Sequence, residues 1–284
     1  MTELLAPFEY NYMVKAIWVS ALVGGTCAFL SVFLMLKGWS LMGDALAHAI
    51  VPGVAGAYLL KLPYAAGAFI AGLLAALGMA IVRHETKLRE DAIIGLVFTS
   101  FFALGLLMVS INPTSVNVQS IVLGNILGIS DEDVVQVVVI SAITLGVLLL
   151  KWRDLMVTFF DEGHARSVGL NTFGLKVLFF TLLSAATVAA LQTVGACLVI
   201  AMVVTPGATA YLLSDRFPNL LRISVAIGSL TSGFGAYVSY FLDGATGGVI
   251  VTLQTLIFLA TFIFAPKHGL LAARRRASTT EVPS

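Results

Sequence analysis

Two residues that could bind a metal, Asp44 and His48, lie four positions apart in an otherwise apolar stretch of the sequence. In an α-helix this spacing places both side chains on one face, about one turn apart. A carboxylate in the hydrocarbon core of a membrane costs roughly 2.5–3.5 kcal/mol on an insertion scale, so it is usually found in a bundle interior or a polar pathway, beside a partner. The pair is therefore the first candidate for a functional site.

From the residues alone, three interpretations of this pair are open. Asp44 and His48 are metal ligands, or a relay for protons, or a hydrogen-bonded pair that only holds helices together. As metal ligands they fill too few of the four or more positions that a metal needs, so water, backbone carbonyls or a second subunit would supply the rest. Two copies meeting across a dimer axis would provide two oxygens and two nitrogens. Such a site suits Mn, Fe(II) or Zn, and the absence of thiolates argues against Cu(I).

The composition indicates that these residues belong to an integral membrane protein. The 284-residue chain is 59% hydrophobic and only 11% charged, whereas soluble domains carry about 25% charged residues. A helix needs about 20 residues to cross a hydrocarbon core of about 30 Å. Candidate spans cover residues 14–36, 44–60, 63–82, 92–111, 134–150, 172–191, 195–213, 223–241 and 248–266. Cys27 and Cys197 lie in apolar runs without metal-binding spacing and are expected to be small core side chains.

Three parts of the chain predict interrupted helices. Residues 177–214 carry no formal charge and are too long for one crossing, so a break is expected at Gln192–Gly195. Residues 112–130 are polar but uncharged and predict a broken or re-entrant segment. Residues 37–62 form either a full span or a broken one. We therefore expect an all-α, polytopic protein with eight or nine transmembrane helices.

Two proline–glycine pairs fall inside predicted spans, Pro52–Gly53 and Pro206–Gly207. Proline frees a backbone carbonyl and kinks a helix. Broken helices of this kind often line the pathway of transporters, although an ordinary kink accommodated by packing is the alternative.

The distribution of charge predicts the orientation of the chain in the membrane. Most of its 16 Lys and Arg residues fall in four segments, 83–91, 151–170, 214–222 and the tail from residue 267. By the positive-inside rule these segments, and with them the C-terminus, face the cytoplasm. The side of the N-terminus depends on the span count.

Segment 151–170 is too polar to span a membrane and longer than a simple connection requires. It predicts a short cytoplasmic helix that docks on another protein, with a helix lying on the membrane surface as the alternative. The sequence contains no GxxxxGK[ST], HExxH or GxSxG motif, so we expect no ATPase, protease or esterase activity in this chain.

Several long segments resemble one family in the right order. They are GWSLMGDALAHAIVPGVAGAYLL (38–60), LREDAIIGLVFTSFFALGLLMVS (88–110), LMVTFFDEGHARSVGL (155–170), LQTVGACLVIAMVVTPGATAYLL (191–213) and DGATGGVI (243–250). Over residues 8–269 the chain resembles the permease subunit of bacterial ATP-binding-cassette (ABC) importers for manganese, iron and zinc, and is most similar to the manganese/iron branch.

The resemblance implies a function and a set of partners. The function is ATP-driven import of Mn²⁺ or Fe²⁺, and also of Zn²⁺, across the bacterial inner membrane, and the alternative is a proton-coupled secondary metal carrier. The implied partners are a cytoplasmic ATPase, a periplasmic metal-binding protein, a second permease subunit and the lipid membrane. No nucleic acid and no permanently bound cofactor are expected, since the metal is cargo.

The resemblance also implies roles for individual residues. Asp44 and His48 would be the metal ligands. That Pro52, Gly53, Pro206 and Gly207 are helix breaks lining the pathway is predicted from the residues alone. Contacts with the ATPase would come from Phe159, Phe160, Asp161, Glu162, His164, Ala165, Arg166 and Gly169. The implied organisation is an N-terminal segment 1–12, a transmembrane domain 13–269 and a disordered cytoplasmic tail 270–284.

Overall fold

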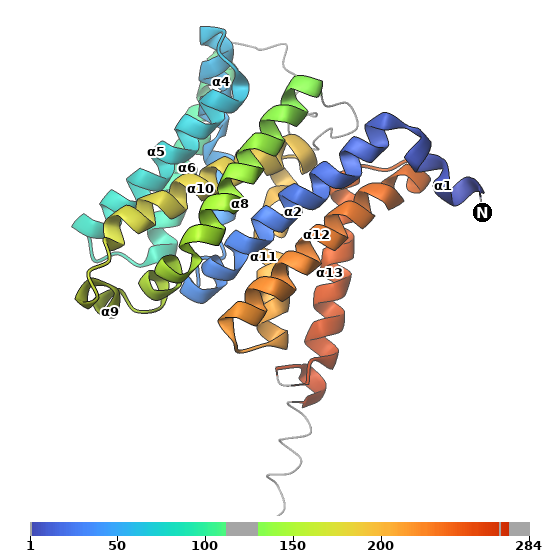
Figure 1. The fold of residues 1–284 in the computed structure, drawn as a ribbon. Coiled ribbons are helices and arrows are strands. Elements are labelled where there is room, and N and C mark those ends of the chain that lie inside the picture. The colour runs from blue at the N-terminus through green and yellow to red at the C-terminus, as the bar shows by residue number, and fades with distance from the viewer. Residues whose placement is uncertain (1, 112–129, 267, 273–284) are drawn as a thin grey trace, which may run out of the picture.

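The computed structural model describes residues 2–111, 130–266 and 268–272, and these residues form a bundle of helices (Figure 1). The helices are α1 (Thr2–Glu9), α2 (Asn11–Lys37), α3 (Met42–Ala49), α4 (Val51–Leu60), α5 (Tyr64–Glu85), α6 (Glu90–Ile111), α8 (Asp131–Phe160), α9 (Glu162–Ser167), α10 (Thr172–Val194), α11 (Ala196–Leu213), α12 (Phe217–Leu242) and α13 (Thr246–Phe264). No strand occurs in these ranges, so the all-α prediction is confirmed. The re-entrant segment predicted at 112–130 and most of the tail lie outside the described residues.

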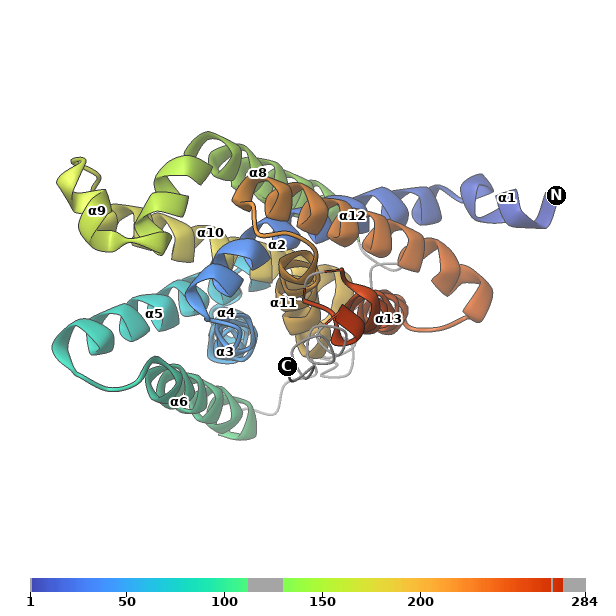
Figure 2. The same ribbon diagram turned by 90° about the horizontal axis from the view of Figure 1, so that it is seen from below.

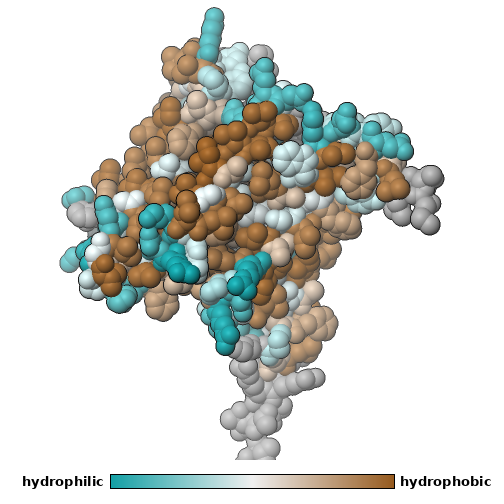
Figure 3. Space-filling view, viewed as in Figure 1, coloured by the Kyte–Doolittle hydropathy of each residue, from teal (hydrophilic) through white to brown (hydrophobic). Residues whose placement is uncertain are grey.

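Eight helices of the described chain are long and apolar enough to cross a membrane, with α3 and α4 counted together as Met42–Leu60. α11 has a shorter apolar stretch, Val199–Leu213, and also runs along the bundle (Figure 1). Apolar side chains spread over the middle of the face seen in Figure 3, with polar ones gathered toward its upper and lower edges. The eight-or-nine-span, multi-pass prediction is confirmed.

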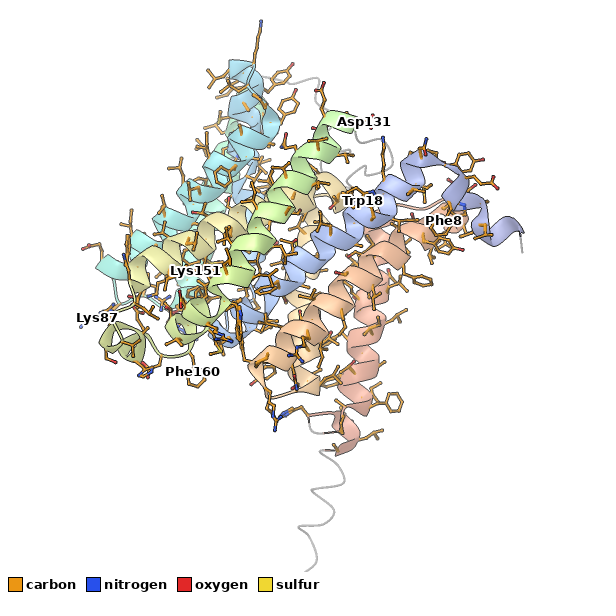
Figure 4. The ribbon with its side chains drawn as sticks, in the orientation of Figure 1. Phe8, Trp18, Lys87, Asp131, Lys151 and Phe160 are labelled. Carbon is orange, nitrogen blue, oxygen red and sulfur yellow. The ribbon has the colours of Figure 1, made fainter. Side chains whose placement is uncertain are left out.

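The two ends of the bundle are chemically different. Lys87 and Phe160 lie at one end and Asp131 at the other (Figure 4). The N-terminal helices join the Asp131 end, because Lys15 Nζ of α2 lies 2.6 Å from Asp131 Oδ1. The start of the chain therefore lies at the end opposite to the basic loops. The predicted number of spans, eight or nine, could not decide this.

α2 is the most deeply buried long helix and packs along α12 at close range. A Cβ atom added at Gly24 would lie 2.5 Å from the Gly228 carbonyl oxygen of α12. Small residues at this crossing let the two backbones approach, as the spacing of Gly228 and Ser232 predicts.

Two of the predicted breaks are present. Gly195 separates α10 from α11 and has φ +84°, in the region that favours glycine. α3 and α4 meet at Ile50, two residues before Pro52, so residues 37–62 form a broken span.

One predicted boundary was wrong. We expected a span at 134–150 followed by a cytoplasmic loop, but α8 continues without interruption to Phe160. At 30 residues it is about 45 Å long, which exceeds the hydrocarbon thickness. The extension stays helical because Leu155 and Phe159 continue the buried stripe of the helix while its charged residues face outward.

Candidate metal site

Asp44 and His48 lie on α3, a short helix that begins after the turn at Gly38 and continues into α4 at Ile50, which keeps right-handed helical backbone angles. α2 ends at Gly38, which has φ +72°, and the Trp39 N–H then bonds to the Leu34 carbonyl at 2.8 Å. This is a Schellman-type helix end, which reverses the chain toward α3. α3 contacts α5, α6, α10 and α11 (Figure 2).

The two side chains interact as their spacing predicts. His48 Nδ1 lies 3.2 Å from Asp44 Oδ1 and 3.0 Å from the Asp44 backbone oxygen. A carbonyl oxygen can only accept a hydrogen bond, so Nδ1 carries the proton and Nε2 keeps its lone pair for a ligand. The side chains are 26% and 36% exposed, so both are accessible from outside this chain.

Two phenylalanines of α6 fix the orientation of the imidazole. The His48 ring meets Phe98 and Phe102 edge to face, with centroid distances of 5.2 and 5.5 Å. These two rings are not among the residues predicted for the site. Phe98 and Phe102 are four residues apart, so the sequence places them on one face of a helix, but it does not show that this face meets α3.

The described residues of one chain supply only part of a coordination shell. Among the described residues no group of three or more His, Cys, Asp and Glu side chains is placed to hold a metal ion. The carboxylate and the imidazole Nε2 provide one oxygen and one nitrogen, and the partial exposure of both leaves the other positions open to groups outside this chain. Such an incomplete shell can bind a divalent metal transiently when water or a second subunit completes it.

The proline–glycine pairs lie at contacts between helices of this chain. A Cβ atom added at Gly53 would meet the Gly67 carbonyl oxygen of α5 at 2.1 Å, and one at Gly105 of α6 would lie 2.8 Å from the Pro52 nitrogen. At the other pair, the Gly207 N–H donates to Ser31 Oγ at 3.0 Å.

Ser31 also donates to the Val204 carbonyl at 3.0 Å, so one hydroxyl of α2 bridges the turn that contains Pro206. Pro52, Pro206 and Gly207 are buried and Gly53 is half-buried. That these residues line the pathway stays a prediction.

The residues expected to contact an ATPase divide into buried and exposed ones. Phe159 is 3% exposed and Ala165 is fully buried, so the structure places both in the protein interior. Phe160 is 79% exposed and points away from the bundle (Figure 4). Asp161 caps α9 by accepting the His164 N–H at 3.0 Å, and Gly169 forms the following turn with φ +83°.

Glu162 holds α9 against α10. Its carboxylate lies 2.6 Å from Arg166 Nη2 and 2.5 Å from Lys176 Nζ. Burial raises the pKa of Glu162, but the hydrogen bonds and charges of Lys176 and Arg166 outweigh it and lower the pKa to about 2. α9 is therefore a firmly attached element at the basic end of the bundle.

A multi-pass bundle of apolar helices, with the Asp44–His48 pair on one of them and a capped helix at its basic end, is typical of a membrane transport protein. The chain belongs to the ABC 3 transport family, whose model matches residues 9–265.

Named relatives and one solved structure agree with this membership. The chain is 72% identical over 273 residues to the chelated iron transport system membrane protein YfeC of Yersinia pestis, covering 96% of this chain and 93% of that protein. It is 49% identical over 276 residues to the manganese transport system membrane protein MntB of Synechocystis, covering 96% and 89%. The structure of PsaBC from Streptococcus pneumoniae in complex with Fab superimposes with a TM-score of 0.85 at 32% identity, covering 96% of this chain and 99% of that one.

Proposed function

We propose that this chain is the permease subunit of an importer that carries Mn²⁺ or Fe²⁺ across the bacterial inner membrane, driven by ATP that a partner hydrolyses. The observation that carries the proposal is the Asp44–His48 pair, with Nε2 free for a ligand, in a member of the ABC 3 transport family. The relatives named for iron and for manganese favour these two metals. Zinc fits the same ligands but has no such support.

The proposed complex contains a cytoplasmic ATPase, a periplasmic metal-binding protein and a second permease subunit. The incomplete shell on this chain supports the second subunit, because two copies of the pair would supply four protein ligands. With the basic loops and the C-terminus in the cytoplasm, α9 and Phe160 face the ATPase and the N-terminus faces the periplasm. Family membership favours this arrangement over a proton-coupled carrier, which would need no ATPase.

The proposed cycle is alternating access around α3. Metal delivered from the periplasmic side is held by the Asp44 carboxylate and His48 Nε2 while the inner side is closed. ATP-driven movement of the ATPase displaces α9, the bundle opens inward, and the metal leaves because its coordination shell is only partly made of protein.

The test is metal uptake by the complete importer in proteoliposomes. Asp44→Asn and His48→Ala, singly and together, are expected to abolish uptake of radioactive Mn²⁺ and Fe²⁺, because each removes one of two protein ligands. Asp243→Asn is a matched control at the turn after α12. Asp243 has φ +45°, a conformation that asparagine adopts readily, so uptake is expected at the wild-type rate.

Full uptake by the double variant would refute the proposed site. Uptake by the purified permease alone, under a pH gradient and without ATPase, would favour the proton-coupled carrier instead.

A further inference from the structure

Trp39 contacts side chains from several neighbouring helices. Its side chain is 3% exposed, and its indole N–H donates to the Glu90 carboxylate at the start of α6. The Arg83 guanidinium at the end of α5 lies over the indole, 5.3 Å from the ring centroid. Arg83 Nη2 also lies 2.5 Å from Glu90 Oε1, so the three side chains form one closed network.

Two more rings connect Trp39 to the helices that lead into and out of α9. Phe159, in the last turn of α8, meets Trp39 edge to face at a centroid distance of 5.5 Å. Phe180 of α10 stacks on Trp39, also at 5.5 Å. No flexible loop separates α8 from α9, because Asp161 both ends α8, through its N–H to the Val157 carbonyl at 2.9 Å, and caps α9. A displacement of α9 is therefore passed to the Phe159 ring.

On its other side Trp39 is attached to the helix that carries the metal pair. The Met42 N–H bonds to the Trp39 carbonyl at 3.1 Å, which joins the tryptophan directly to the start of α3. The backbone reverses at Gly38, just before Trp39, whereas α3 continues into α4 through Ile50, whose N–H still bonds to the Leu46 carbonyl at 3.2 Å. Trp39 and α3 therefore follow one backbone joint, at Gly38, which is a position where a short element can change orientation.

A cavity of about 480 Å³ lies between this element and α9. Trp39 and Met42 line it from the α3 side, and Glu162, Arg166 and Lys176 line it from the α9 and α10 side. This pocket is partly open to the surface, so its two sides can approach each other without displacing buried side chains of the core.

We propose that Trp39 is a positioning residue that transmits displacement of α9 to Asp44 and His48, acting through Phe159 and anchored by Glu90. The proposal rests on the proposed function, since it describes how partner-driven movement reaches the metal pair. It predicts that ATP hydrolysis continues when the link is broken, but that fewer Mn²⁺ ions are transported per ATP hydrolysed.

The experiment compares Trp39→Phe and Glu90→Gln in the complete importer in proteoliposomes, with Mn²⁺ as the probe. Trp39→Phe keeps a ring but loses the N–H bond, and Glu90→Gln keeps an acceptor but loses the charge. Mn²⁺ transported per ATP hydrolysed is therefore expected to fall in each variant, because ATP hydrolysis continues while displacement of α9 no longer reaches the metal pair. The double variant is expected to resemble the single ones, because all three break the same link.

Trp152→Phe is the matched control. Trp152 is another tryptophan that stacks on a phenylalanine, Phe217, and it lies outside the contacts between α9 and α3. This variant should keep the wild-type ratio. A wild-type ratio of Mn²⁺ transported to ATP hydrolysed in both Trp39→Phe and Glu90→Gln would overturn this proposal. The import function is tested separately, by Asp44→Asn. Equal loss of uptake and ATP hydrolysis, with an unchanged ratio, would also overturn it, because that pattern reports a structural role only. Mn²⁺ binding by the purified variants at the wild-type level confirms that they fold.

Discussion

Replacing Ser31 by alanine tests how α2 is joined to α11 beside Pro206–Gly207, where the predicted break is absent because α11 runs through both residues as one helix. Ser31 is fully buried, and its hydroxyl both accepts from the Gly207 N–H and donates to the Val204 carbonyl, each at 3.0 Å. Alanine retains the Cβ atom, so the backbone contact of α2 with α11 is kept and only the two hydrogen bonds are lost. The substitution therefore isolates the polar bridge from the packing around it.

The expected loss of stability follows from these two bonds. Interhelical hydrogen bonds in membrane proteins average about 0.6 kcal/mol and reach about 1.7 kcal/mol, and a buried donor left without a partner costs about 1–3 kcal/mol. We expect Ser31→Ala to lower the free energy of unfolding by about 1–3 kcal/mol. The assay is reversible unfolding of the purified permease in mixed micelles by increasing denaturing detergent.

Ser20→Ala is the matched control on the same helix. Ser20 is also fully buried, but its hydroxyl has no hydrogen-bond partner among the described residues. Removing it should leave stability unchanged or slightly raise it. If Ser31→Ala and Ser20→Ala unfold at the same detergent concentration, the bridge contributes nothing and the reasoning about the joint is wrong.

Two further predictions concern the pH response of α9 and the crossing of α2 with α12. Because its native pKa is lowered from 4.5 to about 2, Glu162 stabilises the folded state fully above about pH 4.5, and this contribution is lost as the pH falls toward 2. Thermal unfolding in detergent between pH 6 and pH 3 should therefore depend less on pH in Glu162→Gln than in wild type, and equal slopes would contradict this. Gly24→Ala forces a Cβ atom to within 2.5 Å of the Gly228 oxygen and should cost about 1–3 kcal/mol. Gly146→Ala, where nothing lies within 4 Å, should instead stabilise α8 by about 0.5–1 kcal/mol, and an equal effect at both positions would refute the steric argument.

The features that the sequence predicts best are those with a local cause. The break before Gly195 follows from the length of an uncharged run and from a residue type that permits a positive φ. The shared face of Asp44 and His48 follows from helical spacing alone. In both cases neighbouring residues along the chain contain the information, so no knowledge of the tertiary packing is needed.

The division of segment 151–170 shows where local reasoning fails. Phe159 and Phe160 are adjacent and chemically alike, yet one is buried against Trp39 and the other is exposed. Leu148, Leu155 and Phe159 lie on one buried face of α8, as their helical spacing indicates. Once α8 is known to extend through residue 160, this spacing places Phe159 on the buried face and Phe160 outside it. The charges of Lys151, Arg153 and Asp154 suggested a loop instead, because a helix that continues beyond the membrane looks polar in composition.

The proposed metal site lies on the short helix α3 rather than on the main crossing of the bundle, and this position bears on how the site could work. α2 and α12 approach so closely that a single added Cβ atom does not fit, which leaves that crossing little freedom to move. A site placed there could bind a metal but could not easily change its geometry to release it. α3 follows the turn at Gly38, lies beside Trp39 and packs through its buried side chains against α5, α6, α10 and α11. Under the proposed cycle Asp44 and His48 would move together with these neighbours, while the crossing of α2 with α12 keeps the fold intact.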